Sequence, residues 1–140
     1  MKKIVLGVIS VILFSCGKKV EVKELEQLNG YWQISKVETT AGDEKEYKVN
    51  ENYDYFSWKN EQGMHKKVRW QPTGKFLVDD LQETVKAEVK SGDLYLNFVS
   101  AFGKHKDKVV KISKDELVLE TENGNENYYT KVTIDGKTTE

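Results

Sequence analysis

The stretch TVKAEVKSGDLYLNFVS, residues 84–100, decides the fold class of this chain. Apolar side chains occupy every second position on both sides of a turn signal at residues 91–93: Val85, Ala87 and Val89 before it, and Leu94, Leu96 and Phe98 after it. Successive side chains of a β-strand point to opposite faces, so each half has one apolar face and one polar face. The stretch therefore predicts a β-hairpin whose register is fixed by the burial of its apolar face.

Segments of similar composition flank this hairpin along most of the chain. They are rich in aromatic and β-branched residues, turn signals separate them, and the chain contains a single proline, Pro72. The segments are residues 31–37, 46–49, 53–59, 66–71 and 75–79 before the hairpin, and residues 110–112, 117–119 and 128–134 after it. About eight to nine short strands without a helical period predict an all-β fold whose antiparallel neighbours pair in sequence order.

We expect these strands to close into an up-and-down β-barrel. Closure removes the exposed edges of the sheet, and about eight strands enclose an interior that side chains can fill or that can hold one small ligand. A β-sandwich is the alternative, because alternation with period two is the same for both architectures.

The chain begins with the features of a secretory signal peptide. Lys2 and Lys3 precede an uncharged run of eleven residues, 4–14. A membrane-spanning helix needs about 20 apolar residues, so this run is too short to span and fits a hydrophobic region that is cleaved off. No other cysteine accompanies Cys16, so the sequence excludes an intramolecular disulfide.

The end of this run resembles a bacterial lipobox. Residues 13–16, Leu-Phe-Ser-Cys, place an aliphatic residue, two uncharged residues and a cysteine in the required order. The resemblance implies that residues 1–15 are removed and that Cys16 receives thioether-linked lipid and a palmitate-like acyl chain. Several acyl chains hold a protein on a membrane where one does not, so we expect anchoring in the cell envelope. In some bacteria an aspartate after the lipidated cysteine retains a lipoprotein in the inner membrane. This chain has Gly17 at that position, which favours the outer membrane, on either its periplasmic or its surface side.

The mature chain divides into a short tether and one domain. Residues 16–27 are largely charged and predict a lipidated tether, in which the spacing of Leu25 and Leu28 allows one helical turn. Residues 28–140 form the predicted barrel domain. Loss of Lys2 and Lys3 changes the net charge from −1 to −3, with both signs interleaved along the chain. This balance provides no basic stripe and excludes nucleic acid as a partner.

The order of several short motifs resembles the lipocalin-like domain lipoproteins of Bacteroidetes-type bacteria. The resemblance covers about residues 27–134, and its motifs are Leu28, Gly30 and Trp32, then residues 72–76, then residues 92–94, then residues 112–119 and 128–132. It implies a lipocalin/calycin-like barrel. It also implies that Trp32 packs across one end of the barrel beneath a late basic side chain, which is Lys131 here.

Aromatic residues concentrate in three consecutive predicted strands. Phe56, Trp58, Trp70 and Phe76 are the candidates for a ligand-binding interior, and alternation places Phe56 and Trp58 on one face. Such rings either fill the barrel as core or line a cavity for an apolar ligand. Both interpretations are compatible with the sequence.

Residues for catalysis or metal binding are scarce. His65 and His105 are the only histidines, both stand beside lysines, and we interpret them as solvated loop residues. The chain lacks phosphate-binding loops, nucleophile elbows and metal-ligand spacings. The sequence therefore predicts no catalytic residue, no metal site, no cofactor and no enzymatic activity.

Two functions of different class are compatible with this sequence. The first is an anchored module that binds a small hydrophobic or amphipathic molecule in the cell envelope. The second is an interaction or scaffolding lipoprotein with a filled barrel, whose predicted loops 60–65 and 102–108 contact another envelope protein. Phe102 favours the second, because a large aromatic residue in a polar loop is often an exposed anchor.

Overall fold

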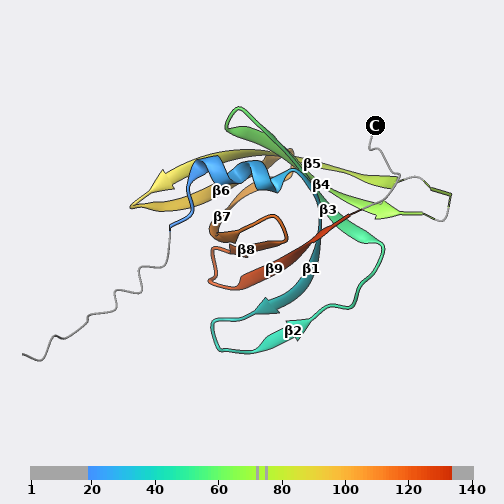
Figure 1. The fold of residues 1–140 in the computed structure, drawn as a ribbon, viewed down its shortest axis with the longest axis horizontal. Coiled ribbons are helices and arrows are strands. Elements are labelled where there is room, and N and C mark those ends of the chain that lie inside the picture. Colours follow the sequence, from blue (N-terminus) through green and yellow to red (C-terminus); the bar gives the residue numbers. More distant parts are fainter. Residues whose placement is uncertain (1–18, 72, 75, 134–140) are drawn as a thin grey trace, which may run out of the picture.

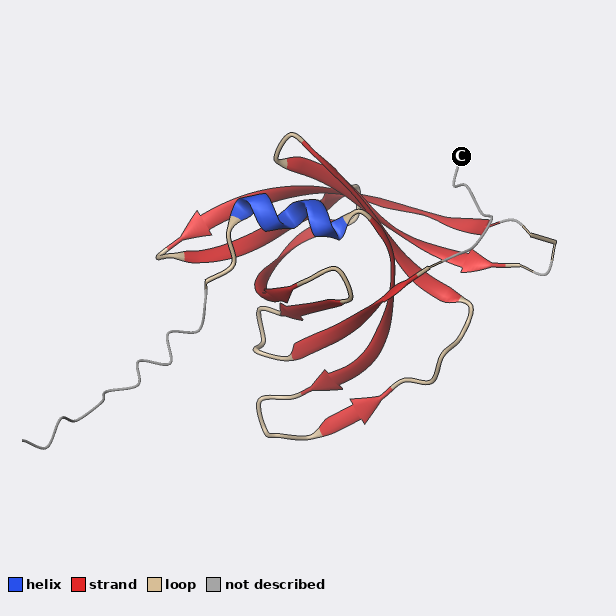
Figure 2. Cartoon of the chain, viewed as in Figure 1, coloured by secondary structure: helices blue, strands red, loops and turns tan. Residues whose placement is uncertain are grey.

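The computed structural model describes residues 19–71, 73–74 and 76–133, with only the backbone described at residues 76–81. Over these ranges the chain forms one short 3-10 helix, η1 (Val22–Leu28), and nine strands (Figure 2). The strands are β1 (Gly30–Glu38), β2 (Glu44–Glu46), β3 (Asn52–Lys59), β4 (Gln62–Trp70), β5 (Phe76–Lys90), β6 (Asp93–Ser100), β7 (Gly103–Ile112), β8 (Glu116–Glu120) and β9 (Glu126–Val132). The described residues include no helix with the length and apolar character needed to cross a bilayer. The predicted signal peptide and Cys16 lie outside the described residues.

The strands form one antiparallel sheet that closes on itself. Their order is β2-β1-β3-β4-β5-β6-β7-β8-β9, and β1 also pairs with β9 along most of its length. Eight strands thus form a ring, and β2 adds to the far half of β1 (Figure 1). The prediction of an antiparallel up-and-down barrel is confirmed, and the sandwich alternative is excluded by the β1–β9 pairing.

The hairpin at residues 84–100 forms as its pattern predicts. Lys90 pairs with Asp93, so the turn consists of Ser91 and Gly92, which both have positive φ angles, of 52° and 81°. This is the mirror-image turn geometry that suits the twist of paired strands. Val85 is buried, whereas Val89 is exposed because the tip of the hairpin projects beyond the ring (Figure 1).

The segments 75–79 and 84–90 are expected as two strands from the sequence, but residues 76–90 form one long strand. β5 runs without a break through the residues between them. Its pairing with β4 shifts register between Lys66 and Val68. Such a bulge bends a strand and increases its twist without ending it, which explains why the two segments are continuous.

The two predicted loops are much shorter in the structure. At residues 60–65 the turn consists of Asn60 and Glu61, with φ angles of 54° and 64°, and β4 begins immediately afterwards. At residues 102–108 only Phe102 belongs to the turn, because β7 begins at Gly103. Two-residue turns connect antiparallel strands with no further loop, so most of each segment belongs to the strand that follows the turn.

Helix η1 closes one end of the barrel. It contacts β3 and β7, which lie on opposite sides of the ring, so the helix crosses the opening. Its Leu25 and Leu28 are fully buried in the core. The segment expected to be a tether is therefore folded onto the domain from Val22, because the spacing of two leucines over one turn gives the helix an apolar face.

Trp32 and Lys131 meet beneath this helix. The Nε1–H of Trp32 donates a hydrogen bond of 2.8 Å to the carbonyl oxygen of Leu28. The Nζ of Lys131 lies 4.6 Å from the centre of the Trp32 ring and donates to the carbonyl oxygens of Gln27 and Asn29. These bonds satisfy carbonyls at the carboxyl end of η1, where a helix leaves them without intrahelical partners. We call this end of the barrel the closed end.

The apolar core fills the barrel from the closed end. Its members are Leu25, Leu28, Trp32, Phe56, Trp58, Val85, Leu94, Leu96, Phe98, Val109, Ile112, Leu117 and Leu119. They come from η1 and from all strands of the ring except β4 and β9, and Tyr129 of β9 packs against them. The opposite end of the ring, which we call the open end, carries the β4–β5, β6–β7 and β8–β9 turns.

If η1 is part of the domain, truncating its buried face should destabilise the whole barrel. We expect Leu25→Ala to lower the free energy of unfolding by about 3 kcal/mol, because it leaves a cavity in a packed core. Glu26→Ala, at the adjacent exposed position, should change it by no more than about 0.5 kcal/mol. Urea denaturation followed by circular dichroism measures both. Equal effects of the two substitutions would show that η1 does not belong to the cooperative unit.

Candidate functional site

The four aromatic candidates do not surround one cavity in the described structure. Phe56 and Trp58 are buried in the apolar core. Trp58 also borders a groove of about 580 Å³ on the outside of the barrel, between η1 and the β3–β4 turn. Trp70 is half-buried at the open end, opposite Phe76 in register, and the side chain of Phe76 lies outside the described part. Of the two interpretations, the packing of Phe56 and Trp58 supports core filling.

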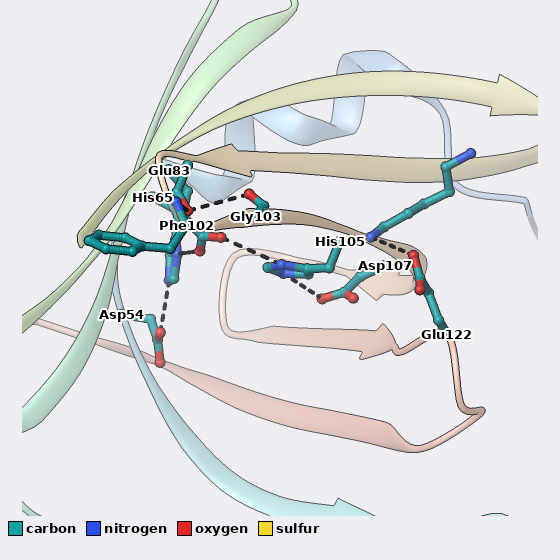
Figure 3. A network of polar contacts seen from close by, with 10 residues as sticks. Asp54, His65, Glu83, Phe102, Gly103, His105, Asp107 and Glu122 are labelled. Atoms are coloured by element: carbon teal, nitrogen blue, oxygen red, sulfur yellow. Dashed lines mark hydrogen bonds and ion pairs between the residues drawn. The ribbon is translucent and has the colours of Figure 1, made fainter.

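Polar side chains replace apolar ones on the inner face of the barrel toward the open end. Five ionisable groups from four strands meet there (Figure 3): Asp54 of β3, His65 of β4, Glu83 of β5, and His105 and Asp107 of β7. We call these five residues the polar layer. Asp54 lies two positions before the buried Phe56 on the same face of β3, and Glu83 lies two positions before the buried Val85 on the same face of β5. The layer therefore occupies positions where alternation would place core residues.

His65 lies between two carboxylates. Its Nδ1 is 2.9 Å from Oε1 of Glu83, and its Nε2 is 2.8 Å from Oδ1 of Asp54. Ionised carboxylates only accept hydrogen bonds, so a proton on each ring nitrogen satisfies both contacts and makes the ring a cation. Burial opposes that charge, but the hydrogen bonds to Asp54 and Glu83 outweigh it and raise the pKa of His65. The hydrogen bond from His65 in turn lowers the pKa of Glu83.

His105 extends the layer toward solvent. Its Nδ1 lies 3.5 Å from Oε2 of Glu83, and its ring stacks on Phe98 with 4.5 Å between centroids and 7° between planes. Its side chain is 46% exposed, whereas the other four members of the layer are nearly buried. His105 is therefore the residue through which a dissolved molecule can reach the layer.

Asp107 is the most perturbed member of the layer. Burial raises its pKa to about 6; His105 lowers it, and the charges of Glu122 and Glu83 raise it further. Tyr129 of β9 faces the same region: burial and the charges of Asp54 and Asp107 raise its pKa. Perturbed groups gathered in one cleft are typical of functional sites, although ion-pair networks also produce them.

The wall of the barrel is incomplete beside His105. Pairing of β7 with β8 starts at Lys108, so among the described residues no strand pairs with the first half of β7 on that side. There Glu122 of the β8–β9 turn accepts a hydrogen bond of 3.1 Å from the backbone N–H of Lys106 (Figure 3). A groove of about 500 Å³ opens at this place, and its lining includes Phe98, His105 and Glu122.

The interpretation of the histidines as solvated loop residues is wrong for His65, and for His105 it is wrong in the loop but not in the exposure to solvent. His65 is buried in β4, and His105 lies in β7 with its ring on Phe98. The neighbouring lysines suggested a polar loop, but the alternation Lys104, Lys106 and Lys108 against His105 and Asp107 was itself the signal of a strand. An alternation whose inner residues are polar escapes a search for apolar periodicity.

Solved structures that are similar to this chain share little of its sequence. The chain is similar to a lipocalin-like protein from Bacteroides uniformis, with 16% identity and a TM-score of 0.46 over 76% of this chain and 99% of that one. It is also similar to an uncharacterized protein from Bacteroides eggerthii (12% identity, TM-score 0.47, 75% and 99% coverage) and to apocrustacyanin C2 (11%, 0.42, 84% and 72%). No protein-family model and no curated sequence matches. Identities this low transfer no ligand or activity to this chain.

Protonation of His65 should make stability depend on pH. A histidine whose pKa is raised by folding stabilises the folded protein. This stabilisation has its full size at pH values below the pKa of the unfolded chain, about 6.5, and is lost as the pH rises through the pKa of the folded protein. We expect the free energy of unfolding to fall as the pH rises above about 6.5. At pH 6, His65→Gln should lower it by about 3 kcal/mol, because two buried carboxylates lose their cation.

Urea denaturation across this pH range checks the expectation. His65→Gln should remove most of the change of the unfolding free energy with pH. Arg69→Gln, at an exposed position of the same strand, should leave that change as it is in the parent chain. If the unfolding free energy of His65→Gln still depends on pH as in the parent chain, a group other than His65 is responsible for the dependence.

Proposed function

We propose that this protein is a membrane-anchored binding protein of the cell envelope, whose barrel takes up a small amphipathic molecule at its open end. The observation that carries the proposal is the polar layer inside an otherwise apolar barrel. An apolar core at the closed end and ionisable groups toward the open end give the interior two chemistries. An amphipathic molecule matches both.

Stability alone does not account for the polar layer. Taking charged groups out of water costs several kcal/mol for each ion, and well-packed apolar residues of similar volume are often as stabilising as a buried ion pair. Phe56, Val85 and Phe98 show that neighbouring positions on the same inner face accept apolar side chains. Buried charges at such positions are therefore best explained by a bound molecule.

The arrangement of the layer supports binding in preference to catalysis. Both ring nitrogens of His65 already contact carboxylates, so this residue has no lone pair with which to accept a proton from a substrate. His105 stacks on Phe98, and neither histidine contacts a serine, threonine or cysteine side chain among the interactions of the described residues. We therefore propose a function without an enzymatic step.

The position of the predicted anchor suggests an orientation. Lys19 lies beside Gly92, at the tip of the β5–β6 hairpin, and Val20 packs against the core near η1. Cys16 precedes Lys19 by three residues, a span of at most about 10 Å. A lipid on Cys16 would thus hold the closed end toward the membrane and leave the open end facing the aqueous phase. We propose that the ligand enters from that side.

A scaffolding function is the second candidate, and the exposure of Phe102 favours it. Phe102 is 84% exposed in the β6–β7 turn at the open end, where an envelope protein could bury it. Phe102→Ser should then abolish capture of a specific partner by crosslinking in cells, without changing small-molecule binding.

Lipidation at Cys16 should be visible as incorporation of labelled palmitate. We expect Cys16→Ala to lose the label and to leave the membrane fraction, because the acceptor thiol is missing. Ser15→Ala keeps a small residue before the cysteine and should behave like the parent chain. A Cys16→Ala protein that retains label and membrane association would contradict the anchor.

A bound molecule should be detectable by native mass spectrometry of protein purified from its own envelope. We expect an added mass that His105→Ala removes, because His105 is the exposed member of the polar layer. Lys111→Ala changes an exposed residue on the same strand and should keep the added mass. Bare protein in every preparation, together with no binding of added amphiphiles, would eliminate the proposed function.

A further inference from the structure

We propose that the open-end site binds an organic ammonium group, a protonated aliphatic amine, with the Asp107 carboxylate as its counter-ion. The inference rests on the proposed function and specifies the chemical class of its ligand. Three observations support it: the surroundings of Asp107, the charge balance of the polar layer, and the stacked rings of Phe98 and His105 beside the layer.

Asp107 is a buried carboxylate without a hydrogen bond among the described residues. It is only 7% exposed, and Nε2 of the His105 ring lies 3.9 Å from its Oδ2, which is too far for a hydrogen bond. Buried carboxylates in native proteins are normally hydrogen-bonded or paired. A donor from outside the chain would satisfy Asp107, and an ammonium group brings both charge and N–H donors.

The charges that face Asp107 leave the site negative. Three carboxylates, those of Asp54, Glu83 and Asp107, share the cation of His65, and Glu122 adds a fourth carboxylate at the rim. The lysines on either side of Asp107 are paired elsewhere, Lys106 Nζ with Glu88 at 2.8 Å and Lys108 Nζ with Asp93 at 3.7 Å, and Lys104 lines the neighbouring groove. Tyr129 contributes a neutral hydroxyl. An anionic ligand would be repelled here, whereas a cation is attracted.

Other cations fit less well than an organic one. No group of three or more histidine, cysteine or acidic side chains within the described residues is arranged to hold a metal ion. The ring of His105, whose side chain is 46% exposed, stacks on the buried Phe98 and gives the site an aromatic surface next to the carboxylates; the face of an aromatic ring attracts alkylammonium groups. Apolar contact of an alkyl chain with Phe98 adds to the charge interaction.

Three probes with the same alkyl chain and different head-group charge separate the contribution of charge to binding from that of apolar contact. The full chain in nanodiscs is titrated calorimetrically at pH 7.5 with n-hexylammonium, hexan-1-ol and hexanoate, with empty nanodiscs as the blank. We expect saturable binding of n-hexylammonium at least tenfold tighter than that of hexan-1-ol, and no binding of hexanoate. Lowering the pH to 5 should weaken the binding of n-hexylammonium about tenfold, because Asp107 gains a proton and loses its charge, and leave the binding of hexan-1-ol unchanged.

A near-isosteric variant tests the role of Asp107 directly. Asp107→Asn removes the charge and should weaken the binding of n-hexylammonium at least tenfold, without an effect on hexan-1-ol. It should fold, because it replaces a buried carboxylate by a neutral amide, and circular dichroism checks this. Asp93→Asn, a matched substitution at the exposed tip of the β5–β6 hairpin, should bind as the parent does.

The outcomes separate the inference from the proposed function. If hexanoate or hexan-1-ol binds as tightly as n-hexylammonium, the amine inference is overturned and the binding function stands. Unchanged affinity in Asp107→Asn, or in the parent chain at pH 5 should that variant not fold, also overturns the inference. If none of the three probes binds and the native mass is bare, both are overturned.

Discussion

Pairing of β1 with β9 is the constraint on which the rest of the structure depends. It joins the first and last strands of the ring and gives the sheet an inside. Once the sheet is closed, every second residue of each strand must lie in the interior, whatever its chemistry. The apolar core, the helix that covers one end and the polar layer near the other all follow from this enclosure.

The two ends of the barrel use buried polar contacts differently. At the closed end, Trp32 and Lys131 each have a defined hydrogen-bond acceptor at or next to the end of η1, so their polar atoms are satisfied within the chain. At the open end, His65 is satisfied by two carboxylates, but Asp107 lacks a donor among the described residues. The polar atoms at the closed end are thus fixed by hydrogen bonds within the chain, whereas the Asp107 carboxylate has only the longer contact with the His105 ring.

The polar layer also links the protonation of its members to the stability of the fold. His65 carries the charge that allows Asp54 and Glu83 to stay buried, so its deprotonation weakens both the layer and the barrel wall on which these residues lie. Asp107, with a pKa of about 6, changes charge in a range close to neutrality. The proposed ligand binding and the change of protonation would therefore act on the same few side chains.

The amino-acid sequence by itself determined the strand pattern, because alternation and turn residues such as Ser91 and Gly92 are local signals that act within a few residues. The continuity of β5, the shortness of the turns and the burial of Leu25 needed the assembled sheet. Only the tertiary structure decided the polar layer. His65 and His105 stand 40 positions apart, each beside lysines, and the local alternation that indicates a strand does not show which of its two faces lies inside the barrel. Closure of the ring brings them to one carboxylate, Glu83, because a barrel turns separate strand positions into neighbours.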